Sequence, residues 1–84
     1  MDAQTLFREG VLALRDRHDA ALARTLLTES LKLNPNNEMA WLWLSRTTSD
    51  AGKKREFIER ALRLNPKNEM ALALRAQLVP VAAR

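Results

Sequence analysis

The sequence predicts an all-α protein built from repeated helical pairs. Two decapeptides, residues 31–40 and 62–71, begin 31 residues apart and match at eight of ten positions. Both contain Asn-Pro, and proline disfavours helical conformation in the residue before it. Apolar residues elsewhere recur at helical spacing. A repeat period of about 20–50 residues is typical of stacked units that together present a binding surface.

Two helices are expected before the first Asn-Pro. The first runs over residues 3–17, and its residues spaced for one face are Ala3, Phe7, Gly10, Val11 and Leu14. Asp19 is placed to cap a second helix. This helix is expected to run to Leu33 and to stop at the first Asn-Pro.

Three more helices follow the same signals. Asn37 is placed to cap a third helix, to about Thr48, and Asp50 a fourth, to Leu64. The second Asn-Pro repeats the stop before a fifth helix, which ends near Val79. Calling the first helix of each pair A and the second B, the expected order is A-B-A-B-A.

Composition indicates one small domain over residues 1–84. The chain has no cysteine and is 46% apolar, which suits a reducing compartment, so the expected location is the cytoplasm. The start of the chain lacks the features of a signal peptide, and no stretch approaches the roughly 20 apolar residues of a membrane span. The net charge of +4 comes from the second half and favours acidic partners.

The repeats resemble the tetratricopeptide repeat (TPR) family, whose unit is an antiparallel helix pair ending in a proline turn. Matching Pro35 to the family's terminal proline places Phe7, Leu14, Ala23 and Leu27 at its signature positions without a gap. The second unit fits when three residues are deleted between its helices. There Trp41 and Leu44 match the signature, while Ser45 stands where the family has glycine, and Trp-Leu-Trp-Leu is similar to bacterial members of the family.

The resemblance implies a right-handed α-solenoid fragment. Its first repeat covers about residues 4–37, a shortened second repeat about 38–68, and a C-terminal helix about 69–79. Trp41 is expected in the core. Trp43 lies about 200° further round the same helix, so the two indoles cannot both face one neighbour.

Family geometry places the binding groove on the A helices, and it implies a non-catalytic module that binds protein. The groove positions are apolar with three arginines, which favours a protein or peptide carrying acidic residues. The family's clamp for a C-terminal carboxylate is not reproduced, since it needs lysine and asparagine at two of these positions. Trp43 is expected to add contact area, and Leu74 belongs to the apolar end of the groove. The residues expected to bind a partner are Arg8, Leu12, Arg15, Met39, Leu42, Trp43, Arg46, Met70, Ala73 and Leu74.

Other functions have less support in the sequence. The basic run at residues 53–55 suggests a nucleic-acid-associated helical module as an alternative. However, Arg55 with Glu59, Glu56 with Arg60, and Glu59 with Arg63 have the spacing of ordinary ion pairs on a helix, so nucleic acid is not the expected partner. One histidine, no cysteine and two glycines indicate no enzyme, no metal site and no cofactor.

The fifth helix is apolar on nearly every side, which is unusual at the end of a repeat stack. A second copy of the chain is the expected cover, giving a homodimer centred on Met39, Leu42, Met70 and Leu74. The alternative is a TPR fragment of a larger regulatory protein, whose next helix would provide the cover.

Overall fold

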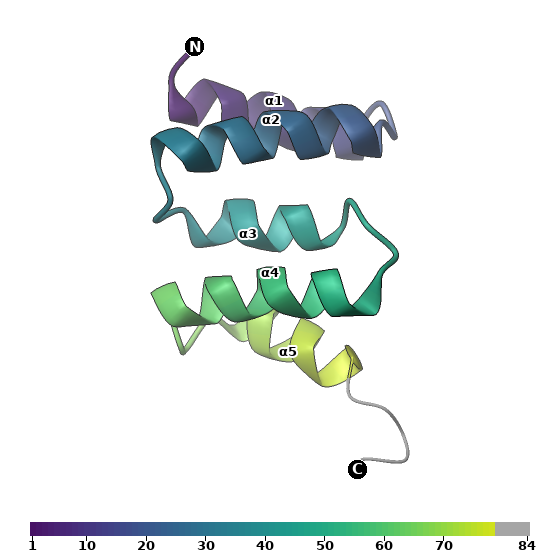
Figure 1. Ribbon diagram of the computed structural model, residues 1–84, viewed down its shortest axis with the longest axis vertical. Helices are drawn as coiled ribbons and strands as arrows, with labels where there is room; N and C mark the ends of the chain where they lie inside the picture. The colour runs from purple at the N-terminus through teal and green to yellow at the C-terminus, as the bar shows by residue number, and fades with distance from the viewer. Residues whose placement is uncertain (79–84) are drawn as a thin grey trace.

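The computed structural model describes residues 1–78, which form α1 (Ala3–Arg15), α2 (Ala20–Leu33), α3 (Glu38–Ser45), α4 (Ala51–Leu64) and α5 (Glu69–Leu78). Successive helices reverse direction, and each packs against the next along the chain (Figure 1). The predicted all-α class with five helices is confirmed for these residues, which contain no strand. The expected helix end near Val79 lies outside the described range. None of the helices described is both long and apolar enough to cross a membrane.

Each helix begins at an aspartate or asparagine whose side-chain oxygen accepts amide hydrogen bonds of the first turn. The capping residues are Asp2, Asp19, Asn37, Asp50 and Asn68. The bond from the Thr5 amide lowers the pKa of the Asp2 carboxyl, because it stabilises the carboxylate. These caps explain why short segments start new helices directly after the turns.

The first helix ends earlier than the sequence predicts, at Arg15 rather than residue 17. His18 has a φ of 53°, the left-handed conformation that often terminates a helix. This conformation brings the Asp19 amide to 2.9 Å from the Ala13 carbonyl oxygen, six residues back. The exposed histidine therefore helps to terminate α1, and the next residue caps α2.

The third helix is also shorter than predicted, ending at Ser45 rather than near Thr48. The Thr47 hydroxyl donates to the Leu44 carbonyl oxygen at 2.7 Å, and the Arg24 guanidinium of α2 donates to the Thr47 carbonyl. The hydroxyl and the carbonyl of Thr47 thus have hydrogen-bond partners although this residue is not helical. As a result, α3 has 8 residues while α2 and α4 each have 14.

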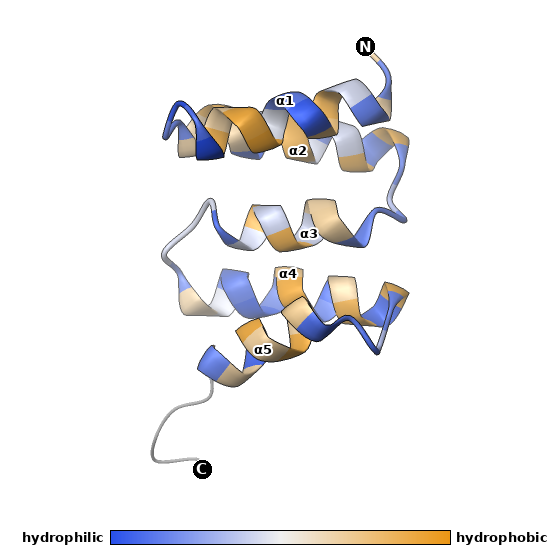
Figure 2. Ribbon diagram, turned by 180° about the vertical axis from the view of Figure 1, so that it is seen from behind, coloured by the Kyte–Doolittle hydropathy of each residue, from blue (hydrophilic) through white to orange (hydrophobic). Residues whose placement is uncertain are grey.

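Two clusters of buried side chains hold the stack together. Leu27, Leu31, Ala40 and Leu44 join α2 to α3. Leu42, Ile58, Ala61, Leu62 and Ala71 join α3, α4 and α5. Figure 2 shows α1 and α5 in front of α2 and α4, with apolar and polar segments alternating along the ribbons.

Gly10 allows α1 and α2 to approach closely. A Cβ atom at this buried position would lie 2.8 Å from the Leu27 Cγ and 3.3 Å from the Leu27 amide nitrogen. The close approach of α1 and α2 therefore requires glycine at position 10.

Candidate functional site

The ten residues expected to bind a partner are called here the predicted groove surface. Nine of them reach solvent and one does not. Arg8, Arg15, Arg46, Met70 and Ala73 are exposed, and Leu12, Met39, Trp43 and Leu74 are half-buried.

Leu42 corrects the prediction. Its side chain is 1% exposed and belongs to the core cluster with Ile58, Ala61, Leu62 and Ala71. A residue in this position holds α3 against α4 and α5 and is not available to a partner. It also cannot lie at the centre of a dimer interface.

Three of the predicted residues line one hollow on α1. Arg8, Leu12 and Arg15 surround it with Gln4, Phe7 and Val11, and its volume is about 240 Å³. The Arg15 Nε atom lies 3.1 Å from an Asp16 carboxylate oxygen, but both side chains are exposed and the pair is weak. The hollow thus combines apolar surface with two cationic side chains.

On α3, an arginine covers a tryptophan. The guanidinium carbon of Arg46 lies 4.9 Å from the centroid of the Trp43 ring, a favourable cation–π distance. The same indole packs against the α2/α3 core on its buried side. Trp41 and Trp43 both contact this core cluster, and Trp41 also packs against the second cluster, which includes Ile58 and Ala61 of α4.

On α5, Met70 is 45% exposed, whereas Leu74 packs against the core that contains Leu42. Met39 of α3 packs against the same core. In this part of the predicted groove surface, Met70 is therefore exposed to solvent, whereas Met39 and Leu74 pack partly against the core.

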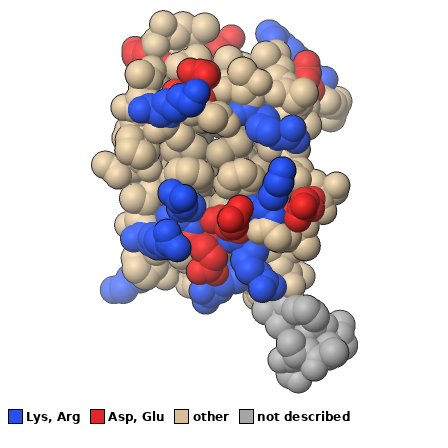
Figure 3. All heavy atoms as spheres, viewed as in Figure 1, with Lys and Arg blue, Asp and Glu red and all other residues tan. Residues whose placement is uncertain are grey.

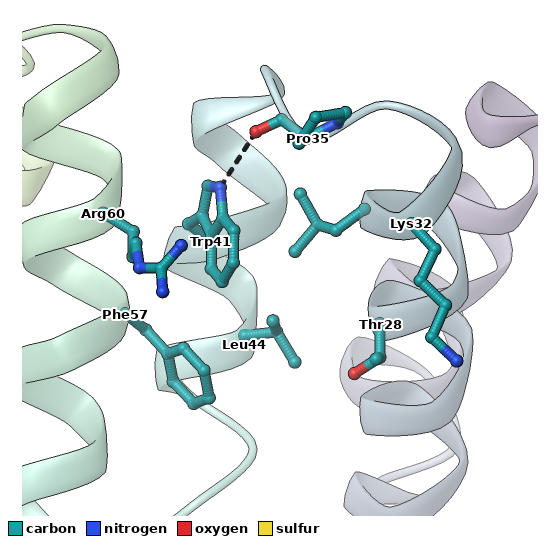
Figure 4. Close-up of a pocket in the computed structure, with 8 residues that line it drawn as sticks. Thr28, Lys32, Pro35, Trp41, Leu44, Phe57 and Arg60 are labelled. Carbon is teal, nitrogen blue, oxygen red and sulfur yellow. Dashed lines mark hydrogen bonds between the residues drawn. The ribbon is translucent and has the colours of Figure 1, made fainter.

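A second concave site, which the sequence did not predict, lies between α2, α3 and α4. It is called here the α2/α3/α4 cleft, and its volume is about 340 Å³. Figure 4 looks into it, with side chains of the three helices pointing toward one another. Its lining residues are Thr28, Leu31, Lys32, Pro35, Trp41, Leu44, Phe57 and Arg60.

Aromatic side chains form the floor of the cleft. The ring centroids of Trp41 and Phe57 are 6.2 Å apart, within the range of favourable aromatic pairs. The Trp41 indole N–H donates to the Pro35 carbonyl oxygen at 3.2 Å, which fixes the ring (Figure 4). The guanidinium carbon of Arg60 lies 5.2 Å from the centroid of the Trp41 ring. Trp41 was expected in the core. It is half-buried, because part of its ring lines the cleft.

A similar hollow, called here the α4/α5 hollow, lies at the equivalent position of the next repeat. Its volume is about 330 Å³, and each lining residue lies 31 positions after a lining residue of the cleft. The repeat in the sequence thus becomes a repeat of surface shape, and this register is the signal that relates the two sites. The lining residues are Glu59, Leu62, Arg63, Pro66, Leu72 and Arg75.

The ion pairs expected along α4 are absent from the part of the chain that the structure describes. Glu59 instead pairs with Arg75 of α5, at 3.6 Å, and Arg60 lies over Trp41. Figure 3 shows Lys and Arg side chains interspersed with Asp and Glu on the lower part of the face, with uncharged atoms across its middle.

No protein-family model matches the chain. No curated protein matches its sequence. Within residues 1–78, no three His, Cys, Asp or Glu side chains are grouped so that they could hold a metal ion.

Proposed function

We propose that this chain is a non-catalytic, TPR-like helical-repeat module that binds a protein partner through the predicted groove surface without Leu42. The observation that carries the proposal is the pairing of exposed guanidinium groups with part-exposed apolar side chains. Arg46 lies over Trp43, and Arg8 and Arg15 flank Leu12. Aromatic and arginine side chains are the residues that most often dominate binding at protein interfaces.

The chemistry of this surface favours an amphipathic, acidic segment. The surface has three arginines and no carboxylate among its own residues. Arginine binds carboxylates through two parallel hydrogen bonds, and apolar side chains such as Met39 and Met70 adapt to the partner's shape. A cysteine-free sequence agrees with a cytoplasmic location for this binding.

A peptide tests the proposed binding. A labelled helical peptide with leucine and glutamate at amphipathic spacing is expected to bind, with fluorescence anisotropy as the measurement. Arg46→Glu is expected to weaken binding roughly two- to thirtyfold, because reversal replaces an attraction by a repulsion of similar size. Arg63→Glu, at an exposed position on α4 outside the surface, is the control. Equal losses in both variants would show that only net charge matters and would contradict the proposal.

Self-association is the second part of the proposal, and α5 supports it. Met70 and Leu72 are 45% and 37% exposed, so one short helix presents two large apolar side chains to solvent. A contact between two copies would remove this apolar area from water at about 25 cal/mol per Å². Met70, Leu74 and Met39 remain as the expected centre of the dimer.

The solution mass across a concentration range tests the dimer. Sedimentation equilibrium is expected to give twice the chain mass, and Met70→Lys is expected to return the monomer, because burial of an unpaired ammonium group is costly. Leu33→Lys is the matched control, since Leu33 is exposed at the end of α2. A monomer at every concentration for the unmodified chain would contradict self-association.

A further inference from the structure

We propose that the α2/α3/α4 cleft is a second docking site, which takes an aromatic side chain of an acidic peptide segment from a protein partner. The site goes beyond the function proposed above, since it uses residues of α2, α3 and α4 that do not belong to the predicted groove surface. Its size, its charge and its difference from the α4/α5 hollow each support this occupant.

The cleft has the size and the walls for a ring. Its volume of about 340 Å³ lies at the lower end of ligand pockets, about 300–1,000 Å³. An engineered apolar cavity of about 150 Å³ in another protein binds benzene, so one phenyl ring and its peptide attachment fit. Trp41, Phe57 and Leu44 provide apolar contact area in its lining.

The charges of the lining favour carboxylates beside the ring. Lys32 and Arg60 belong to the lining, which contains no acidic residue. Lys32 lies 3.3 Å from Glu29, but both side chains are largely exposed, and such pairs exchange easily. Arg60 forms no ion pair within residues 1–78 and rests on Trp41, so its hydrogen-bonding N–H groups remain available to a carboxylate.

The α4/α5 hollow lacks these features at the corresponding positions. Leu72 stands in place of Trp41, and Glu59 in place of Thr28. Arg75 takes the place of Leu44 and pairs with Glu59 at 3.6 Å, which neutralises the charge. The two sites share a shape but not a chemistry, so the hollow provides an internal control for the cleft.

A nucleic acid base is a poorer occupant than a peptide side chain. Bases bind to such sites by stacking on an open aromatic face. In the cleft, the Arg60 guanidinium lies over Trp41, and Phe57 is tilted by 30° against the same indole. One face of the Trp41 indole is therefore already covered by Arg60, which leaves less open aromatic surface for a base to stack on.

Nuclear magnetic resonance of the full chain tests the site, because its two tryptophans give two indole N–H signals. The probe is a short blocked peptide with one phenylalanine between glutamates. We expect the Trp41 indole signal to move during titration while the Trp43 signal stays. Lys32→Glu and Arg60→Glu are expected to raise the Kd roughly two- to thirtyfold. Arg63→Glu, the repeat equivalent of Lys32→Glu, is expected to leave the Kd unchanged.

Several outcomes would overturn the docking site. Equal binding of a peptide with lysines in place of the glutamates would remove the preference for acidic partners. A thymidine oligonucleotide that displaces the peptide would assign the cleft to nucleic acid. Movement of the Trp43 signal alone would place the peptide on the predicted groove surface, which supports the proposed function and contradicts this one. No movement at millimolar peptide would contradict the site outright.

Discussion

Leu42→Ala is expected to lower the free energy of unfolding by about 2–5 kcal/mol. The side chain is 1% exposed and packs with Ile58, Ala61, Leu62 and Ala71, so truncation leaves a cavity where α3, α4 and α5 meet. Small domains are held by only about 5–15 kcal/mol, and the loss is a large share of that total. Urea unfolding followed by helical circular dichroism measures the change.

Leu33→Ala is the matched control for this substitution. Leu33 is 61% exposed at the end of α2, and leucine and alanine have similar helix propensities. Its change in unfolding free energy is expected to stay within about 0.5 kcal/mol. Equal, small changes in the two variants would contradict the placement of Leu42 in the core.

The order of the helices could be predicted because its signals are local. Each Asn-Pro stops a helix through its own backbone restrictions, and Asp19, Asn37 and Asp50 cap the next helix with their own side chains. These effects need no knowledge of distant residues. They therefore appear in the structure at the predicted positions.

The face of α3 was harder to predict. Its residues from Met39 to Leu44 are all apolar, so no polar stripe marks the side that faces solvent. Family geometry assigned Leu42 to the groove, whereas packing against α4 and α5 buries it. The early end of α3 also depends on a distant residue, since Arg24 of α2 holds Thr47.

The cleft was missed because three helices build it. Trp41 lies on α3 and Phe57 on α4, and nothing local indicates that their rings meet. Similarly, spacing within α4 predicted partners for Glu59, but Arg75 of α5 binds it instead. Only the 31-residue register, applied to a known shape, relates the cleft to the α4/α5 hollow.

A polar link between the two Asn-Pro turns shows what the repeated motif does in the fold. One carboxylate oxygen of Glu38, from the first motif, accepts from the side-chain amides of Asn65 and Asn68 in the second motif, at 3.0 and 2.7 Å. Asn68 is buried, and its other side-chain atom caps α5. The link therefore ties the start of α3 to the start of α5 across the end of α4.

Glu38→Ala is expected to cost about 1–3 kcal/mol of unfolding free energy, because it leaves the amide group of buried Asn68 without its acceptor. Glu69→Ala is the matched control. Glu69 lies 31 residues later, is the first residue of α5 as Glu38 is of α3, and is exposed. Both variants lose the same favourable charge at a helix start. The difference between their unfolding free energies therefore isolates the link, and equal values would show that it contributes nothing to stability.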